Sequence, residues 1–506
     1  MTRGIRVVAV SAAIVAATFA IHADVPSNHA IDIQLQLGRL LFEDGRYAES
    51  LEAYQNALTA DDSVRLRAAR FGVIQSALRV AEFDFARREA DTLIKASPRD
   101  PEALSLYADS RWASGLFEEA EARYRDVLAM APAQARARHG VARSLMARGQ
   151  LDHALDEAQW ALKLAPRDLE IHHTVGAIYE RMHKFEEAAS AFSNYVNLLP
   201  NKDHSDKADW SRAEIRFLRS FGQRVPFDMD SNADDALYTV PFRLVNDKVI
   251  IRAKVNGGSA QDFIVDTGSE STVLSHQTAE RLGVAPITYT VSAGVGEVGL
   301  RGLQLARIDT FEIGALNTLK LRNVPCIIKN PALRDIPMRE AESFSPLALG
   351  FSMTIDYQRY QLTIGRHLPE EPADVELPLR LYRLATVRGV VDGDHEADFV
   401  IDTGGEVISI SQATATSLGR PEPAHKIALK VYGTSGWDRG AFLMPGVDLA
   451  FDAIHYTNYP VVVLNLRAPS ALVGFQLGGI VGHRFLSRYR VGIDLEKSVL
   501  RLKAAS

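Results

Sequence analysis

The sequence is poor in cysteine, in long apolar runs and in charge of one sign. Its 506 residues include one cysteine, Cys326, so no internal disulfide can form and a Cys-rich scaffold is excluded. The net charge is −6 and no Lys/Arg run dominates, which argues against a nucleic-acid partner. With 34 Gly and 21 Pro, the chain is neither collagen-like nor of low complexity. Its length predicts about three domains.

Motifs for metals and cofactors are also missing. No histidine has metal-ligand spacing, so we expect no metal and no cofactor. Residues 294–299 fit the pattern GxGxxG, but a strand-like alternation follows where a dinucleotide site would need a helix. Cys326 lies in an apolar stretch, and we expect it in the core.

The N-terminus has the pattern of a secretory signal. Two arginines precede an apolar run of fifteen residues, 7–21, and Ala23 is a suitable cleavage site. We therefore predict a signal peptide over residues 1–23 and an exported protein, periplasmic or secreted, without a stable membrane span afterwards. An uncleaved signal that anchors the protein in a membrane is the alternative.

The first half of the chain is a helical repeat. Pro98, Pro132, Pro166 and Pro200 stand 34 residues apart, each after a stretch with helical periodicity. Small residues recur at one position of each unit and aromatic residues at others: Ala120, Ala154 and Ala188, and Phe117, Tyr124, Phe185 and Phe192. The pattern resembles the tetratricopeptide repeat family, with five repeats and a closing helix within residues 31–222. The resemblance implies a curved surface for a protein or peptide partner, although a spacer without a ligand is also open.

The second half is a duplicated β unit. A turn-rich linker, 223–237, leads into short strands with frequent glycine. Residues 263–283 align without a gap onto residues 399–419, 136 positions later, and 10 of the 21 pairs are identical. The duplication predicts two β lobes, 238–368 and 374–504.

Each lobe has an Asp-Thr-Gly turn after an apolar strand, at Asp266 and at Asp402. An apolar strand ends in a buried acid only when that acid has a partner. Two related lobes that face each other would bring the carboxyls together, where they share one proton and titrate as a pair. Such a pair can activate water and protonate a carbonyl oxygen, which predicts peptide-bond hydrolysis without a covalent intermediate.

These residues resemble the retropepsin-like aspartic peptidases. The resemblance implies an all-β bilobal fold with Asp266 and Asp402 as the catalytic pair. It also implies supporting residues in the two catalytic loops, namely Thr267, Gly268, Ser269, Thr403, Gly404 and Gly405. The threonines would bond across to the opposite loop. Two flap hairpins, 290–302 and 430–442, would cover the substrate through Gly294, Gly296, Tyr432, Gly433, Gly436 and Trp437. For Tyr432 and Trp437, packing beneath the flap is the alternative.

Further family features follow each catalytic turn. Leu347–Gly350 and Ile480–Gly482 have the pattern of the element that supports the catalytic loop, and the terminal strands of the lobes could pair with each other. Ile355 stands only five positions after Gly350, whereas Ile493 stands eleven positions after Gly482, so the first lobe is expected to lack most of a short helix.

The two catalytic loops also differ in sequence. A Ser269 hydroxyl could bond the carboxylate of Asp266, whereas Gly405 offers none, so we expect Asp266 to be the more readily charged acid. Glu270 and Glu406 follow the turns and are expected to be solvated.

The sequence thus predicts an aspartic endopeptidase with a polypeptide substrate and an active site formed within one chain, most simply a monomer. A binding or scaffold protein that keeps the peptidase fold without activity is the alternative. A third possibility is pairing of lobes between chains.

Overall fold

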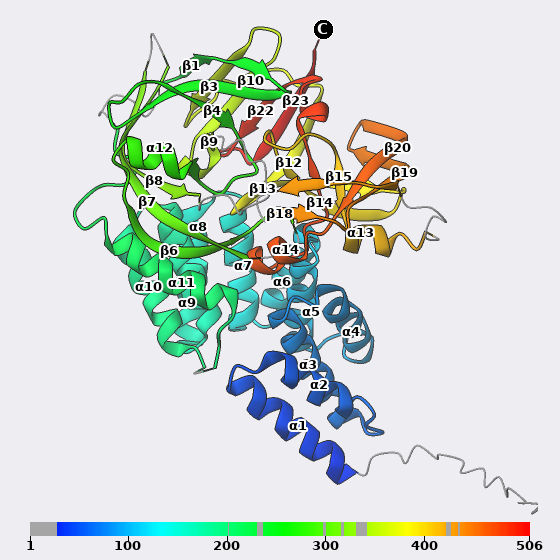
Figure 1. The fold of residues 1–506 in the computed structure, drawn as a ribbon. Helices are drawn as coiled ribbons and strands as arrows, with labels where there is room; N and C mark the ends of the chain where they lie inside the picture. Colours follow the sequence, from blue (N-terminus) through cyan, green and yellow to red (C-terminus); the bar gives the residue numbers. More distant parts are fainter. Residues whose placement is uncertain are drawn as a thin grey trace, which may run out of the picture.

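The computed structural model describes residues 28–200, 202–229, 236–296, 300–314, 318–329, 342–420, 427–433 and 436–505. The predicted signal peptide, 1–23, lies outside these residues. Eleven helices precede the first strand in this part of the chain (Figure 1). They are α1 (Asn28–Glu43), α2 (Tyr47–Ala57), α3 (Ser63–Arg79), α4 (Phe83–Ala96), α5 (Pro101–Ala113), α6 (Phe117–Met130), α7 (Ala135–Ala147), α8 (Leu151–Leu164), α9 (Leu169–Arg181), α10 (Phe185–Leu198) and α11 (Asp206–Arg219).

Helices α1 to α10 form the five predicted repeat pairs, which confirms the tetratricopeptide architecture. The small residue of each repeat allows this packing: Ala120, Ala154 and Ala188 are completely buried. The aromatic of one helix faces a glycine of the next, and a Cβ at Gly140 would overlap the ring of Tyr124. Interiors are too densely packed to admit that extra carbon.

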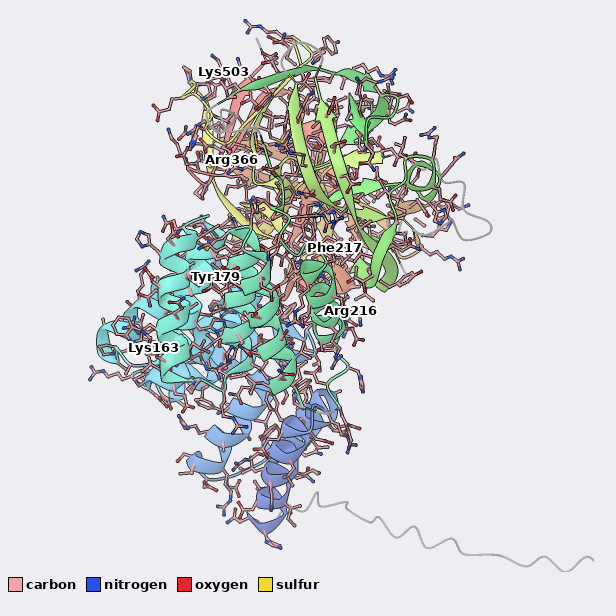
Figure 2. The ribbon with its side chains drawn as sticks, turned by 90° about the vertical axis from the view of Figure 1, so that its left-hand side faces the viewer. Lys163, Tyr179, Arg216, Phe217, Arg366 and Lys503 are labelled. Carbon is pink, nitrogen blue, oxygen red and sulfur yellow. The ribbon has the colours of Figure 1, made fainter. Side chains whose placement is uncertain are left out.

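Helix α11, which corresponds to the predicted closing helix, also contacts the first lobe. It packs against strand β6 (Pro286–Ala293) of the first lobe, and Arg216 Nε donates to Thr288 Oγ1 over 3.2 Å. Figure 2 shows Arg216 and Phe217 where the helices meet the lobes. Phe217 is 3% exposed and belongs to the same hydrophobic core as the first lobe. The predicted closing helix therefore joins the repeats to the lobes.

The repeats also contact the second lobe. The backbone N–H of Gln476 donates to the carbonyl of Ala113 over 2.7 Å, and the rings of Phe475 and Phe117 are 4.9 Å apart. Arg380 Nη2 binds Glu118 at 2.6 Å. Apolar and polar contacts to both lobes thus fix the array beside them.

The first lobe follows the linker. Its sheet has the order β2-β3-β4-β9-β5-β8-β7-β6, with α12 (His276–Arg281) after β5. Besides β6, the strands of this sheet are β2 (Arg243–Val245), β3 (Lys248–Val255), β4 (Gln261–Val265), β5 (Thr272–Leu274), β7 (Leu300–Ile313), β8 (Leu319–Ile328) and β9 (Glu342–Phe344).

The second lobe repeats this plan. The order of its strands is β13-β14-β21-β15-β20-β19-β16, with the separate hairpin β17-β18. Its elements are β13 (Leu384–Val391), β14 (His395–Ile401), β15 (Ser409–Ser411), α13 (Gln412–Ser417), β16 (Ile427–Ala428), β17 (Val431–Gly433), β18 (Gly436–Asp438), β19 (Phe442–Phe451), β20 (Ile454–Leu464), α14 (Arg467–Val473), β21 (Gly479–Val481) and α15 (His483–Leu486).

Six strands from both lobes, in the order β1-β11-β10-β22-β23-β12, continue the sheet of the second lobe through the pairing of β12 with β13. They are β1 (Tyr238–Pro241), β10 (Ser352–Asp356), β11 (Gln361–Gly365), β12 (Val375–Tyr382), β22 (Tyr489–Asp494) and β23 (Val499–Ala504). The expected pairing between lobes occurs at β10 and β22, where Thr354 opposes Gly492. Backbone hydrogen bonds between the lobes therefore lie within one chain.

The expected loss of a helix in the first lobe is wrong. Strand β9 runs parallel to β4, as β21 runs parallel to β14, so β9 is the true counterpart of β21 and supports the catalytic loop. The 3-10 turn Leu347–Leu349 occupies the place of α15, after the strand and not within it. The apolar-apolar-Gly pattern misled the alignment because Ser345, not glycine, follows β9.

Candidate active site

Each catalytic turn begins where an apolar strand ends. Strand β4 ends at Val265 and β14 ends at Ile401. The backbone N–H of Asp266 donates to the carbonyl of Phe344 over 2.9 Å, and that of Asp402 to Val481 over 3.0 Å. Equivalent strands thus support both acids with the same bond.

Four hydrogen bonds lock the two turns together. Thr267 Oγ1 donates to the carbonyl of Ile401 over 2.6 Å, and Thr403 Oγ1 donates to that of Val265 over 2.7 Å. Each hydroxyl also accepts the backbone N–H of the other threonine over 3.1 Å. Both threonines are buried, and buried bonds of this kind fix the relative position of the lobes.

Asp266 and Asp402, the predicted dyad, immediately precede the two threonines in sequence. A Cβ at Gly268 would be 2.5 Å from Cγ of Asp402, and one at Gly404 would be 2.6 Å from Cγ of Asp266. Only glycine leaves room for the opposite carboxyl at these positions. The two carboxyls lie within hydrogen-bond reach of each other, which favours a proton shared between them.

Burial, followed by the charge of Asp402, raises the pKa of Asp266 to about 7. Burial also raises the pKa of Asp402, but the backbone N–H groups of Gly405 and Gly404 oppose this effect. Both donate to Asp402 Oδ1 over 2.8 Å, whereas Asp266 accepts one such bond, from Gly268 over 3.1 Å. Asp402 is therefore the more readily ionised acid.

The expectation that Asp266 is the more readily charged acid, which was based on the Ser269 hydroxyl, is wrong. The Ser269 hydroxyl donates to the carbonyl of Ser271 over 2.8 Å and leaves Asp266 without that bond. Gly405, the residue expected to contribute nothing, provides a backbone donor instead. The local course of the turn decides which group reaches the carboxylate.

Lys248, at the start of β3, is a site residue that the sequence did not reveal. Its ammonium donates to the carbonyl of Gly404 and lowers the pKa of Asp402. Leu384 stands 136 residues later, so a lysine in place of an apolar residue in a duplicated strand was the available sign. The positive charge of Lys329 likewise lowers the pKa of Asp266.

The flap hairpins meet above the dyad. A Cβ at Gly433 would overlap the carbonyl oxygen of Val295, so the two tips touch. Gly294, Tyr432 and Gly433 line the cavity over the dyad. Trp437 packs edge-on against Tyr432, with the ring centroids 5.2 Å apart.

The remaining flap residues of the prediction lie away from the cavity. Among the described residues, Gly296, Gly436 and Trp437 are not part of its lining. For Trp437, packing therefore describes its position better than substrate contact.

The two glutamates after the turns differ. Glu406 is exposed and pairs with Arg484 at 2.7 Å, as expected of a solvated acid. Glu270 is not solvated as expected: Arg383 donates to its Oε2 from Nε over 2.9 Å and from Nη2 over 2.5 Å. Arg383 comes from the β12–β13 hairpin of the other lobe and was also missed, because no local pattern indicates a partner so distant in sequence.

A cavity of about 2480 Å³ extends from the dyad to the inner face of the repeats. In Figure 1, β6, β18 and α14 lie on the side of the lobes that faces the helices. The wall on the repeat side includes Asp109, Arg143, Glu170 and Lys207. The repeats and the catalytic lobes thus share one chamber.

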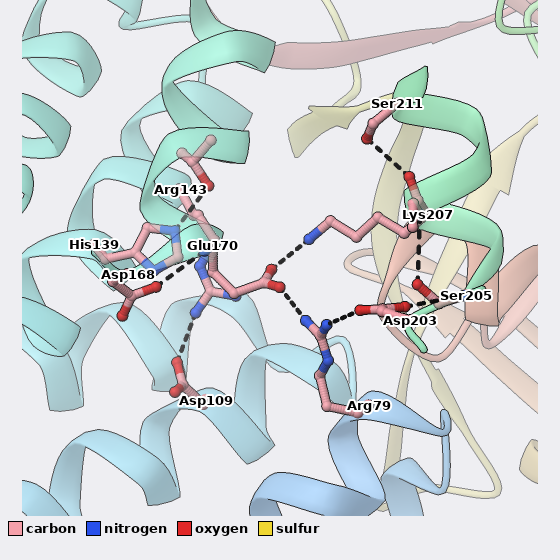
Figure 3. A network of polar contacts seen from close by, with 12 residues as sticks. Arg79, Asp109, His139, Arg143, Asp168, Glu170, Asp203, Ser205, Lys207 and Ser211 are labelled. Atoms are coloured by element: carbon pink, nitrogen blue, oxygen red, sulfur yellow. Dashed lines mark hydrogen bonds and ion pairs between the residues drawn. The ribbon is translucent and has the colours of Figure 1, made fainter. Parts of the chain in front are cut away.

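Charges on the inner face of the repeats pair with each other. Glu170 lies between Lys207 and Arg79 and binds both (Figure 3). Arg79 also binds Asp203 at 2.9 Å, which connects α3 to the segment before α11. Arg143 binds Asp109 at 2.7 Å. These ion pairs bridge the concave surface from its early repeats to its end.

Other expected features concern the core and bound groups. Cys326 is buried, and burial raises the pKa of its thiol. Within the described ranges, no three His, Cys, Asp or Glu side chains converge as a metal site. No helix in this part of the chain is long and apolar enough to cross a membrane.

The comparisons with known proteins agree with this architecture. The family described as aspartyl protease matches residues 251–351, and the tetratricopeptide repeat family matches residues 74–135 and 107–168. The chain therefore contains an aspartyl protease domain with N-terminal tetratricopeptide repeats. No curated protein matches the sequence.

Solved structures resemble part of the chain. A tetratricopeptide protein of the thermophile Thermus thermophilus is 21% identical and covers 34% of this chain and 93% of its own, with a TM-score of 0.30. MamA of Desulfovibrio magneticus is 18% identical over 34% and 97%, with a TM-score of 0.25. The human IFIT1 dimer is 17% identical over 38% and 46%, with a TM-score of 0.32. Nothing about function follows from likeness at these levels.

Proposed function

We propose that the protein is an aspartic endopeptidase. The observation that supports this most strongly is the pair of interlocked Asp-Thr-Gly turns, which hold two half-buried carboxyls within hydrogen-bond reach of each other. A pair that shares a proton at the floor of a cavity has one group to accept a proton and one to donate.

In the proposed reaction, the Asp402 carboxylate removes a proton from water as the water oxygen attacks the peptide carbon. Asp266 gives its proton to the carbonyl oxygen, which forms a neutral tetrahedral diol. Asp402 then protonates the leaving nitrogen, the C–N bond breaks, and a diol hydroxyl returns a proton to Asp266. No covalent bond to the enzyme forms, and both acids regain their starting states.

The shared chamber supports a role for the repeats in holding the substrate or a protein partner. The paired charges on their inner face, such as Arg79 with Asp203, leave their wall polar. Strand β9 supports Asp266 as β21 supports Asp402, which favours an active enzyme over the alternative of an inactive scaffold. Pairing of β10 with β22 within the chain also favours a monomer over lobes shared between chains.

The test is cleavage of a denatured protein by the full chain between about pH 3 and pH 7. We expect cleavage that a statine-type peptide inhibits and that both Asp266→Asn and Asp402→Asn abolish. Cleavage that survives in either variant would refute the dyad. Sedimentation of the active enzyme at twice the monomer mass would refute the single-chain site.

We further propose export through the signal peptide at residues 1–23. Mass spectrometry of the protein recovered from outside the cytoplasm should give a mature N-terminus at Asp24. A retained N-terminus in a membrane fraction would instead indicate an anchor.

A further inference from the structure

Two glutamates of the repeats line the chamber that contains the dyad. Glu180 lies at the end of α9 and Glu214 in the middle of α11. Glu214 is 5% exposed. Neither residue takes part in catalysis as proposed above.

Neither carboxyl has a hydrogen-bonding or ion-pair partner among the residues that the structure describes. The nearby cations are used elsewhere: Arg383 binds Glu270 through two nitrogens and lies over the ring of Trp210 at 4.9 Å. Lys207 binds Glu170. One guanidinium thus serves three carboxyls, those of Glu180, Glu214 and Glu270.

An unpaired buried carboxyl is costly, and its pKa rises until it stays protonated. Burial, followed by the charge of Glu180, raises the pKa of Glu214, and burial raises that of Glu180 to about 7. The charged groups that act on this pair are Arg383 and Glu270. His173 on α9 stays neutral because burial lowers its pKa, and the positive charge of Arg383 also lowers it. The pair therefore has free acceptor oxygens, because Arg383, the cation that acts on it, forms its hydrogen bonds with Glu270.

The position of the pair connects it to the dyad. Glu270 follows Asp266 by four residues in the catalytic loop, and its partner Arg383 faces Glu180 and Glu214. A peptide that lies across the dyad therefore has this wall within the same chamber. A divalent metal fits less well, since the described acids do not converge as ligands.

We propose that Glu180 and Glu214 form a subsite for a basic side chain of the substrate, lysine or arginine, so that the repeats set part of the cleavage specificity. This proposal rests on the proposed function. The lysine ammonium carries three donors, and arginine carries five, so either side chain can satisfy both carboxyls. The bound cation would favour the ionised form of the carboxyl, and a bond between a buried carboxylate and a cation is stronger than one between neutral groups.

The test uses quenched fluorescent peptides with acetylated N-termini, in which one lysine is scanned across four positions on each side of the cleaved bond. Norleucine and acetyl-lysine replace lysine in matched peptides. In the unmodified enzyme, we expect kcat/KM to be at least about ten-fold higher with lysine at one position. In Glu214→Gln and in Glu180→Gln, the ratio of lysine to norleucine should fall towards one. Glu187→Gln, an exposed acid on α10, should keep the original ratio.

A binding measurement separates this proposal from the proposed function. In the Asp402→Asn background, fluorescence anisotropy should give a lower Kd for the lysine peptide than for the norleucine peptide, and Glu214→Gln should remove the difference. Cleavage of lysine and norleucine peptides at equal rates at every position would refute the subsite and leave the peptidase intact. Tight, lysine-dependent binding without cleavage by the unmodified enzyme would refute the peptidase and leave the subsite intact.

Discussion

Replacement of Asp266 by asparagine should stabilise the protein at neutral pH and abolish activity. The pKa of Asp266 rises from 3.8 to about 7 on folding because the side chain is buried beside Asp402. Between these values the unfolded chain binds fewer protons than the folded one, so the free energy of unfolding falls as the pH rises. Each pKa unit corresponds to about 1.4 kcal/mol, which gives a loss of about 4 kcal/mol between pH 4 and pH 7. Asparagine has no proton to lose and avoids this loss.

The assay is calorimetric unfolding of the full chain at pH 4 and at pH 7. The variant and the original protein should unfold at similar temperatures at pH 4, and the lobe transition of the variant should be on the order of 10 °C higher at pH 7. Asp262→Asn, an exposed acid on β4 paired with Arg243, is the control and should change stability by less than about 1 kcal/mol at either pH. A gain from Asp266→Asn that is equal at both pH values would refute the assignment of the proton to the dyad.

Three further outcomes follow from the site. Activity should decline as the pH rises through about 7, because Asp266 then loses the proton that it must donate; a rate that still increases above pH 8 would contradict this role. Thr403→Val should destabilise the lobes by about 2–6 kcal/mol relative to Thr403→Ser, since it leaves the buried carbonyl of Val265 and the buried N–H of Thr267 unpaired, and calorimetry of both variants measures the difference. Gly433→Ala should raise the KM for peptides, because the added carbon would overlap the Val295 carbonyl at the flap contact; an unchanged KM would indicate that the tips separate freely when substrate binds.

Periodic features of the fold could be predicted from the sequence. The spacing of 34 residues and the Ala120-type positions led directly to five helix pairs, because each repeat packs against its neighbours in the same way. The spacing of 136 residues likewise led to two lobes with one topology. The role of α11 could not be foreseen, since its apolar face would fit a solvated end or a docked lobe equally well. Only the contact with β6 distinguishes them.

The candidate site could likewise be predicted from the sequence only in part. Sequence was sufficient for the dyad and the threonines, whose roles depend on a local turn repeated twice. It failed where a side chain had a choice of partners, as Ser269 does in bonding Ser271 instead of Asp266. It also failed for Arg383 and Lys248, which reach the catalytic loop of the opposite lobe. Partners so distant in sequence leave no local pattern to read.

The asymmetry of the dyad arises where the two lobes differ from each other in sequence. Each turn has an equivalent supporting strand and equivalent threonine bonds. In a symmetric dimer of such lobes, the two acids would therefore be equivalent. Fusion into one chain allowed each half to diverge: Gly405 adds a donor to Asp402, and Lys248 adds a positive charge on the same side. The repeats, which contact both lobes, add a third, unrelated wall to the chamber. A single chain can thus fix which acid holds the proton and present a chamber wall that differs from one side of the dyad to the other.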